Sequence, residues 1–104
     1  MHYNTVIVGA GSAGAIIATR LTEDRDHTVL LLEAGPDYPT LDRTPGPIRD
    51  GLTNAGDVII RERHNWNLTA TASPTAPPMY VPRGRVVGGS SAINGQIFLR
   101  GAQE

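Results

Sequence analysis

Three glycines near the start of the chain have the spacing of a nucleotide-binding loop. Gly9, Gly11 and Gly14 form the pattern Gly-x-Gly-x-x-Gly, and Glu33 follows nineteen residues after the last glycine. In such a loop the glycines allow a tight turn, close approach of the backbone to a pyrophosphate, and close packing of a helix on a strand. A carboxylate at this distance can accept ribose hydroxyls and would repel a 2′-phosphate. The spacing therefore predicts a site for FAD or NAD and disfavours NADP.

A second stretch, residues 84–101, reads "GRVVGGSSAINGQIFLRG" and contains no histidine, lysine, cysteine or carboxylate. We expect Ser90 or Ser91 to cap a helix, with the free amides of its first turn facing outward. This would make a second anion-binding turn, and a simple hairpin-like loop is the alternative. Neither interpretation gives the stretch a side chain for acid–base or nucleophilic catalysis.

The elements that would position these residues form a βαβ unit. Residues 3–8 and 28–32 are apolar runs typical of strands, and the segment between them has helical periodicity. A crossover helix makes two such strands parallel. Its amides at Ser12 and Ala13 would point to the phosphates, where the helix dipole favours negative charge. The predicted apolar face of the helix consists of Ala13, Ile16, Ile17 and Leu21.

The middle of the chain, residues 36–78, is rich in turn signals and predicts a long loop with one helical turn at 47–52. Residues 80–85 are expected to form an extended arm because a proline lies within them. His64 has no acid or metal-ligating partner in the pattern, and we expect it at the surface. Trp66 is expected to anchor packing, although its indole could cover a flat cofactor.

Composition excludes several classes of function. The 104 residues carry a net charge of −1 and nine arginines without a lysine, a distribution that does not form a basic face for nucleic acid. Cysteine is absent, which excludes disulfides and thiolate metal sites, and no metal site is predicted. No apolar run has transmembrane length and no signal-peptide pattern precedes the first strand. We therefore expect a cytoplasmic protein without a membrane span.

The motifs "VIVGAGSAGAIIATRL", "LLLEAG" and "PRGRVVGGSSAINGQIFLRG" resemble the N-terminal part of the glucose–methanol–choline (GMC) family of FAD-dependent oxidoreductases. The resemblance runs over the whole chain and is looser in the middle, where "NWNL" also matches. It implies FAD, which spacing alone does not distinguish from NAD. The cofactor-binding residues that it implies are Gly9, Gly11, Ser12, Ala13, Gly14, Glu33, Ala34, Trp66, Val87, Gly89, Ser90, Asn94, Gly95 and Ile97.

Each group of these residues has its own implied contact. The glycine loop would face the pyrophosphate, with Glu33 on the ribose and Ala34 beside the adenine. Val87, Gly89 and Ser90 would line the diphosphate and the ribityl chain. Asn94, Gly95 and Ile97 would lie along the isoalloxazine. Some relatives attach the flavin covalently through a histidine whose position is Ile93 here, so we expect noncovalent FAD. The flavin would supply the redox chemistry.

The resemblance also implies that catalytic residues lie elsewhere. Relatives place a histidine, paired with histidine or asparagine, far beyond this signature, and His2, His27 and His64 match no such pattern. We therefore predict no catalytic residue in this chain. The implied reaction of the complete enzyme is oxidation of a small-molecule alcohol to an aldehyde or ketone by hydride transfer to FAD. Alternatives are lyase or decarboxylase chemistry on the same fold, or a nonenzymatic FAD-binding fragment.

The predicted fold class is α/β: a Rossmann-like FAD-binding βαβ unit with a loop-rich extension. We divide one FAD-binding domain into residues 1–35, the βαβ unit, 36–78, the connection, and 79–104, the second FAD-binding segment. A parallel sheet is buried on both faces and needs more strands than this chain supplies. We therefore expect the remaining C-terminal polypeptide of the same enzyme as a separate chain.

Overall fold

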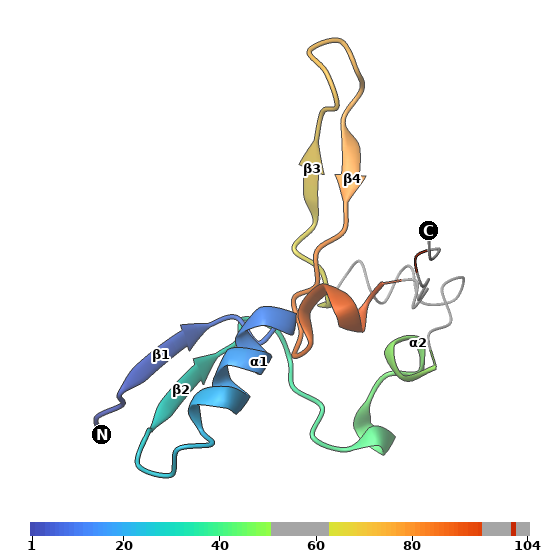
Figure 1. The fold of residues 1–104 in the computed structure, drawn as a ribbon. Helices are drawn as coiled ribbons and strands as arrows, with labels where there is room; N and C mark the ends of the chain where they lie inside the picture. The colour runs from blue at the N-terminus through green and yellow to red at the C-terminus, as the bar shows by residue number, and fades with distance from the viewer. Residues whose placement is uncertain (51–62, 95–100, 102–104) are drawn as a thin grey trace.

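The structure, a computed structural model, describes residues 1–50, 63–94 and 101. Its elements in chain order are β1 (Thr5–Val8), α1 (Ser12–Leu21), β2 (Val29–Leu32), the 3-10 helix η1 (Leu41–Arg43), α2 (Gly46–Arg49), β3 (Leu68–Ala70), β4 (Met79–Val81) and the 3-10 helix η2 (Gly89–Ala92). Figure 1 shows β1, α1 and β2 as one unit, with the β3–β4 hairpin extending away from it.

The first three elements form the predicted βαβ unit. β1 and β2 pair in parallel, with Thr5 opposite Val29 and Val8 opposite Leu32. The strands are shorter than the apolar runs that predicted them, but their order and direction are confirmed. The mixed α/β class is therefore confirmed.

Close packing of α1 on β1 depends on Gly14. A Cβ atom at this position would collide with the carbonyl oxygen of Gly9 and lie 3.2 Å from Cγ2 of Ile7. Only glycine therefore lets the first turn of the helix lie directly against the end of the strand.

The apolar face predicted for α1 is wrong in part. Ile16 is 63% exposed and Ile17 is half exposed, whereas Gly14, Ala18 and Leu21 are partly buried. These three residues share one face at i, i+4 and i+7. Because Gly14 brings the helix axis close to the strand, the face with the small residues Gly14 and Ala18 packs against the sheet. Both isoleucines therefore face outward.

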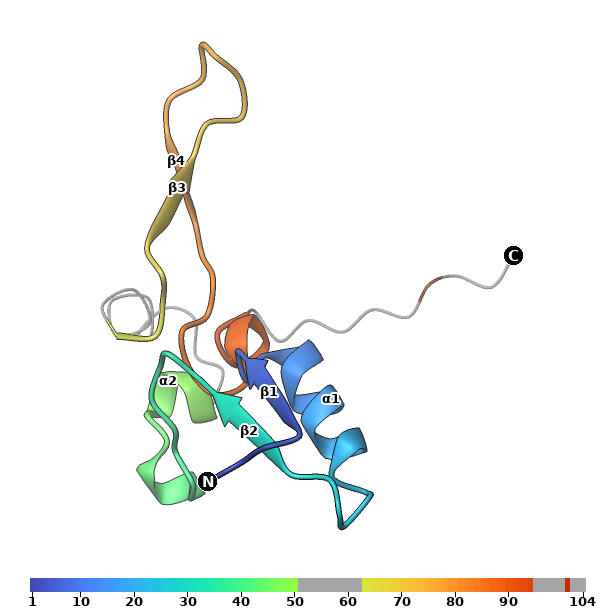
Figure 2. The ribbon, with the colours of Figure 1, turned by 90° about the vertical axis from the view of Figure 1, so that its left-hand side faces the viewer.

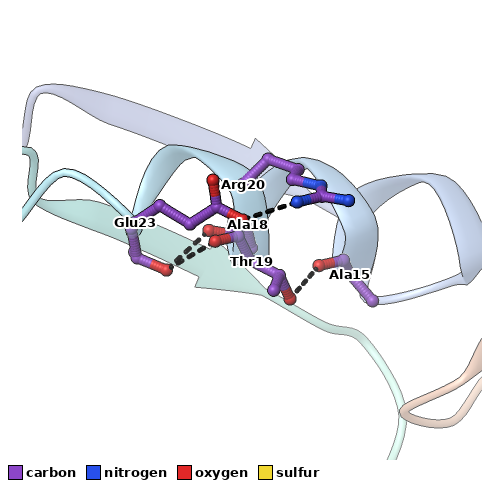
Figure 3. A network of polar contacts seen from close by, with 6 residues as sticks. Ala15, Ala18, Thr19, Arg20 and Glu23 are labelled. Carbon is purple, nitrogen blue, oxygen red and sulfur yellow. Dashed lines mark hydrogen bonds and ion pairs between the residues drawn. The ribbon is translucent and has the colours of Figure 1, made fainter.

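A local polar network runs along α1 and into the turn that follows it (Figure 3). Thr19 Oγ1 donates to the carbonyl oxygen of Ala15 at 2.8 Å, and Arg20 forms an ion pair with Glu23 at 2.6 Å. Both charged side chains are well exposed, so the pair contributes little to stability. The network extends from Ala15, directly after the glycine loop, to Glu23 in the turn that follows α1.

The middle of the chain contains a hairpin that the sequence did not predict. β3 and β4 pair antiparallel, with Leu68 opposite Val81 and Ala70 opposite Met79. Figures 1 and 2 both show this hairpin rising from the βαβ unit. The expected arm at 80–85 thus begins as a strand, and the expected helical turn at 47–52 falls at α2, with residues 51 and 52 outside the described residues.

The described core is small and partly polar. Its buried apolar residues are Ile7, Ala10 and Val86. His64, predicted at the surface, is only 1% exposed, and its Nε2 lies 2.6 Å from the Tyr38 hydroxyl. The prediction failed because the partner lies 26 residues away and is brought near only by the fold.

Two further properties concern the described part of the chain alone. No helix in residues 1–50 and 63–94 is long and apolar enough to cross a membrane. The same residues contain no cluster of three or more side chains able to hold a metal ion.

Candidate cofactor site

The glycine loop, the end of β2 and the start of η2 surround one cavity of about 950 Å³. This volume is within the upper range of small-molecule sites. Ten of the fourteen residues proposed for the cofactor line it: Gly9, Gly11, Ser12, Ala13, Gly14, Glu33, Ala34, Trp66, Gly89 and Ser90. Segments that are distant in sequence therefore meet at the cavity.

The glycine loop turns sharply out of β1 and opens α1 toward the cavity. Gly9 has φ +96°, a conformation that other residues adopt only with strain. The helix has no side-chain cap, and its first backbone hydrogen bond runs from Ala15 N to Gly11 O at 2.9 Å. The amides of Ala13 and Gly14 precede that bond, so they remain for an anionic ligand.

Glu33 is held at the end of β2 by the backbone on both sides. Its Oε2 accepts a hydrogen bond from Ala10 N at 2.7 Å, and its Oε1 accepts one from Gly35 N at 2.9 Å. Each carboxylate oxygen has capacity for a further hydrogen bond, and the side chain lines the cavity. The fixed carboxylate can therefore accept hydroxyl groups of a ligand.

The second bend lies directly beside the glycine loop. Gly88 N donates to Ala10 O at 2.9 Å, and Gly11 and Gly88 form a parallel bridge. A Cβ atom on Gly89 would be only 2.8 Å from the Gly11 Cα atom. The two glycine-bearing turns, about 75 residues apart in the chain, thus contact each other through backbone atoms.

The expected helix cap at Ser90 or Ser91 is wrong. Gly88, at φ +97°, precedes the 3-10 helix, which begins at Gly89 before either serine. Ser90 Oγ instead accepts from Gly84 N at 3.1 Å, and Ser91 Oγ donates to Gly88 O at 2.7 Å. The positive φ angles of both glycines turn the chain early, and the serine hydroxyls then stabilise that turn from within.

The amides of this second bend are also less available than expected. Gly88 N is bonded to Ala10 O, and Gly89 N donates to Val86 O at 2.8 Å. The Gly88 and Gly89 amides are therefore used within the protein, whereas the Ala13 and Gly14 amides at the start of α1 remain for an anion.

One wall of the cavity comes from the hairpin and the segment after it. Trp66 is 50% exposed and lies on the cavity, with the Arg85 guanidinium carbon 5.9 Å from its ring centroid. Arg83 also lines the cavity, although sequence reasoning left it out of the site. The remaining lining residues that it missed are Val8, Leu32, Leu68 and Gly84. A signal for Arg83 was present, since it is the second residue of the quoted motif "PRGRVVGGSSAINGQIFLRG".

The other four proposed residues have different places. Val87 and Asn94 are described and do not line the cavity, and Val87 N donates to Pro36 O at 3.1 Å. Gly95 and Ile97 lie outside the described residues. The cofactor contacts proposed for all fourteen residues remain predictions.

A buried polar layer supports the second bend from behind. The carbonyl oxygen of His64 accepts from Arg85 N at 2.8 Å, and Asn65 Oδ1 accepts from Arg83 N at 3.0 Å. Asn65 is only 2% exposed. These bonds hold residues 83–85 beside Trp66.

The cavity fits a dinucleotide in three physical respects. It is large enough, it has free amides at a helix N-terminus, and it has a fixed carboxylate for hydroxyl groups. Side chains at Gly11 or Gly89 would project into the narrow region where the two turns meet.

Comparison with known proteins identifies the family. The profile of the GMC oxidoreductases matches residues 3–104. The chain belongs to the GMC oxidoreductase family. It is 46% identical over 104 residues to an oxygen-dependent choline dehydrogenase of Citrobacter koseri, covering 97% of this chain and 18% of that protein.

Solved structures of GMC-type enzymes agree with this assignment. Pyridoxine 4-oxidase from Mesorbium loti superposes with a TM-score of 0.71 at 35% identity, covering 96% of this chain and 19% of the other. An FAD-dependent oxidoreductase from Chaetomium thermophilum gives the same TM-score and identity, covering 96% of this chain and 16% of the other. The chain thus spans about a fifth of the length of these relatives, and the family supports FAD as the cofactor.

Proposed function

We propose that this chain is the FAD-binding N-terminal part of an enzyme that oxidises a small-molecule alcohol to an aldehyde or ketone. The observation that carries the proposal is the contact between the two glycine turns, made by Gly88 N and Ala10 O at 2.9 Å on the rim of a cavity that Glu33 lines. This arrangement provides phosphate and ribose contacts for one dinucleotide.

The residues of the chain would bind and orient the cofactor. The amides of Ala13 and Gly14 would donate to the diphosphate, and Glu33 would accept the adenosine ribose hydroxyls. Trp66 would cover one side of the bound molecule. When bound, FAD supplies the redox chemistry by accepting the hydride of the alcohol. Noncovalent binding is part of the proposal, because Ile93 replaces the histidine to which some relatives attach the flavin.

A further C-terminal polypeptide, expected as a separate chain, would complete the fold and supply the catalytic base. Val6 lies on the sheet face opposite Ile7, away from the residues that line the cavity, and is 55% exposed. Parallel sheets are covered on both faces in stable proteins. These observations support a partner on this face, and the cytoplasmic location stays a prediction from the sequence.

The proposal is tested on natively purified protein. We expect a flavin absorption spectrum, a second and larger polypeptide on a denaturing gel, and release of the flavin when the protein is denatured. Under anaerobic conditions, one member of a panel of primary and secondary alcohols should bleach the flavin absorption.

Each departure from this result has a separate meaning. Colourless protein would contradict FAD binding, and flavin that stays with the denatured band would contradict noncovalent attachment. Bound flavin that no alcohol bleaches would favour lyase or decarboxylase chemistry, or a nonenzymatic FAD-binding protein.

A further inference from the structure

Arg83 is the one cationic side chain among the described residues that line the cavity, and Glu33 is the one anionic side chain there. Among the described residues the guanidinium makes one hydrogen bond, from Nη1 to Pro82 O at 2.7 Å. The ion pairs within the described residues join Arg20 to Glu23 and Arg49 to Asp50, so neither contains Arg83. Most of its N–H donors thus remain available at the cavity.

The backbone of Arg83 is fixed, although its side chain is exposed. Its amide donates to the buried Asn65 Oδ1 at 3.0 Å, and its carbonyl oxygen accepts from Trp66 N at 3.0 Å. The next residue, Gly84, is bonded to Ser90 Oγ, and a Cβ atom on it would collide with the Gly89 carbonyl. The side chain therefore starts from a defined point next to the second glycine turn.

The charges at the cavity favour such a group. A dinucleotide carries a negative charge on each phosphate, and Glu33 adds another at the same cavity. The start of α1 offers only the partial positive charge of a helix terminus. The amides of Gly88 and Gly89 are already bonded within the protein. On the side of the second turn, Arg83 is the one described cationic side chain that lines the cavity and can compensate the charge of a phosphate.

We propose that Arg83 binds the diphosphate of the dinucleotide, opposite the amides at the start of α1. The planar guanidinium can donate two parallel hydrogen bonds to phosphate oxygens, which an ammonium group cannot do. This inference rests on the proposed function, because it assigns one more residue to the same cofactor.

Binding constants of apoprotein, prepared from the natively purified protein, test the proposal. FAD binding is followed by flavin fluorescence, with ADP and adenosine as competitors. Arg83→Gln should weaken the binding of FAD and of ADP by about ten- to a hundredfold, which is the range for a lost charge-assisted hydrogen bond. Adenosine lacks the diphosphate and should bind Arg83→Gln as it binds the wild type. Arg83→Lys should be intermediate, because it keeps the charge and loses the two-point contact.

The matched control is Arg25→Gln, which removes the same charge from an exposed turn between α1 and β2 and should leave all three constants unchanged. Circular dichroism establishes whether the variants fold. If Arg83→Gln does not fold, Arg83→Lys decides: it should bind ADP more weakly than the wild type and bind adenosine equally well, and wild-type ADP binding by folded Arg83→Lys would overturn the inference.

Unchanged ADP binding in a folded Arg83→Gln would overturn the inference. A variant that binds FAD more weakly but ADP as tightly as the wild type would also overturn the inference, because Arg83 would then contact the flavin and not the diphosphate. Both results leave the proposed function intact, whereas wild-type protein that binds no FAD would refute the two together.

Discussion

The contact between the two glycine turns predicts that Gly89→Ala damages both the fold and the cofactor site. Gly89 has φ +60°, and a Cβ atom there would lie 2.8 Å from the Gly11 Cα atom and 3.7 Å from its nitrogen. The first of these distances is shorter than real Cβ contacts, and its partner is backbone that cannot rotate away. The turns must therefore separate to admit even a methyl group.

The magnitude follows from two costs. A left-handed conformation costs an L-residue about 1–2 kcal/mol, and a forced close contact in a packed region adds about 1–3 kcal/mol. Gly89→Ala should thus lower the free energy of unfolding by about 2–5 kcal/mol. Because separation also opens the cavity, FAD affinity should fall at least about tenfold.

Gly11→Ala is the informative comparison on the opposite turn. Its φ is −74°, and the new Cβ atom would lie 3.8 Å from the Gly89 Cα atom, an ordinary contact. Stability should therefore change by no more than about 1 kcal/mol. FAD affinity should still fall, since the methyl group occupies the space where the backbone approaches the pyrophosphate.

The assay is urea unfolding of the apoprotein, followed by circular dichroism, together with an FAD titration. Gly46→Ala is the neutral control, because its Cβ atom would be 3.6 Å from the flexible Asp50 side chain. Wild-type stability of Gly89→Ala would refute the contact between the turns. Wild-type FAD affinity of Gly11→Ala would refute the placement of the pyrophosphate.

Three further changes test other parts of the structure. Glu33→Gln places a side-chain amide group against a backbone N–H. It should lower the free energy of unfolding in urea by about 1.5–3 kcal/mol and weaken FAD binding; an unchanged stability and FAD affinity would contradict the role of the carboxylate. Tyr38→Phe removes the hydroxyl that lies 2.6 Å from His64 Nε2 and should lower the free energy of unfolding by about 1–3 kcal/mol. The control Tyr3→Phe, at the exposed N-terminus, should lower it by less than about 0.5 kcal/mol. Equal effects of the two substitutions would argue against a structural role of the Tyr38–His64 pair. Val6→Lys should lower the melting temperature of the complete protein, because it would place a charge beneath the proposed partner; an unchanged melting temperature would mean that this face is not covered.

The sequence predicted the βαβ unit because its signals are local. The spacing of Gly9, Gly11 and Gly14 specifies a turn and a close helix–strand contact within a few residues, and the structure shows both. The side of α1 that packs was harder to predict, since hydrophobicity alone favoured Ile16 and Ile17. In the structure the close approach at Gly14 decides which face packs.

Features that depend on distant partners escaped prediction. His64 is buried beside Tyr38, a hydrogen-bonding partner 26 residues away in the chain. β3 pairs with β4 across a loop whose residues show only turn signals. The sequence predicted a second turn but neither its backbone contact with the first turn nor its detailed geometry. Positive φ angles at Gly88 and Gly89 start the 3-10 helix before the serines, and no local pattern distinguishes this turn from a serine-capped helix.

An experimental structure of the natively purified protein with its cofactor tests the central claim most directly, through the position of the diphosphate. We predict diphosphate density within hydrogen-bonding distance of the Ala13 and Gly14 amides and next to the turn at Gly89. A flavin nucleotide bound elsewhere, or a diphosphate that contacts only one of the two turns, would contradict the account.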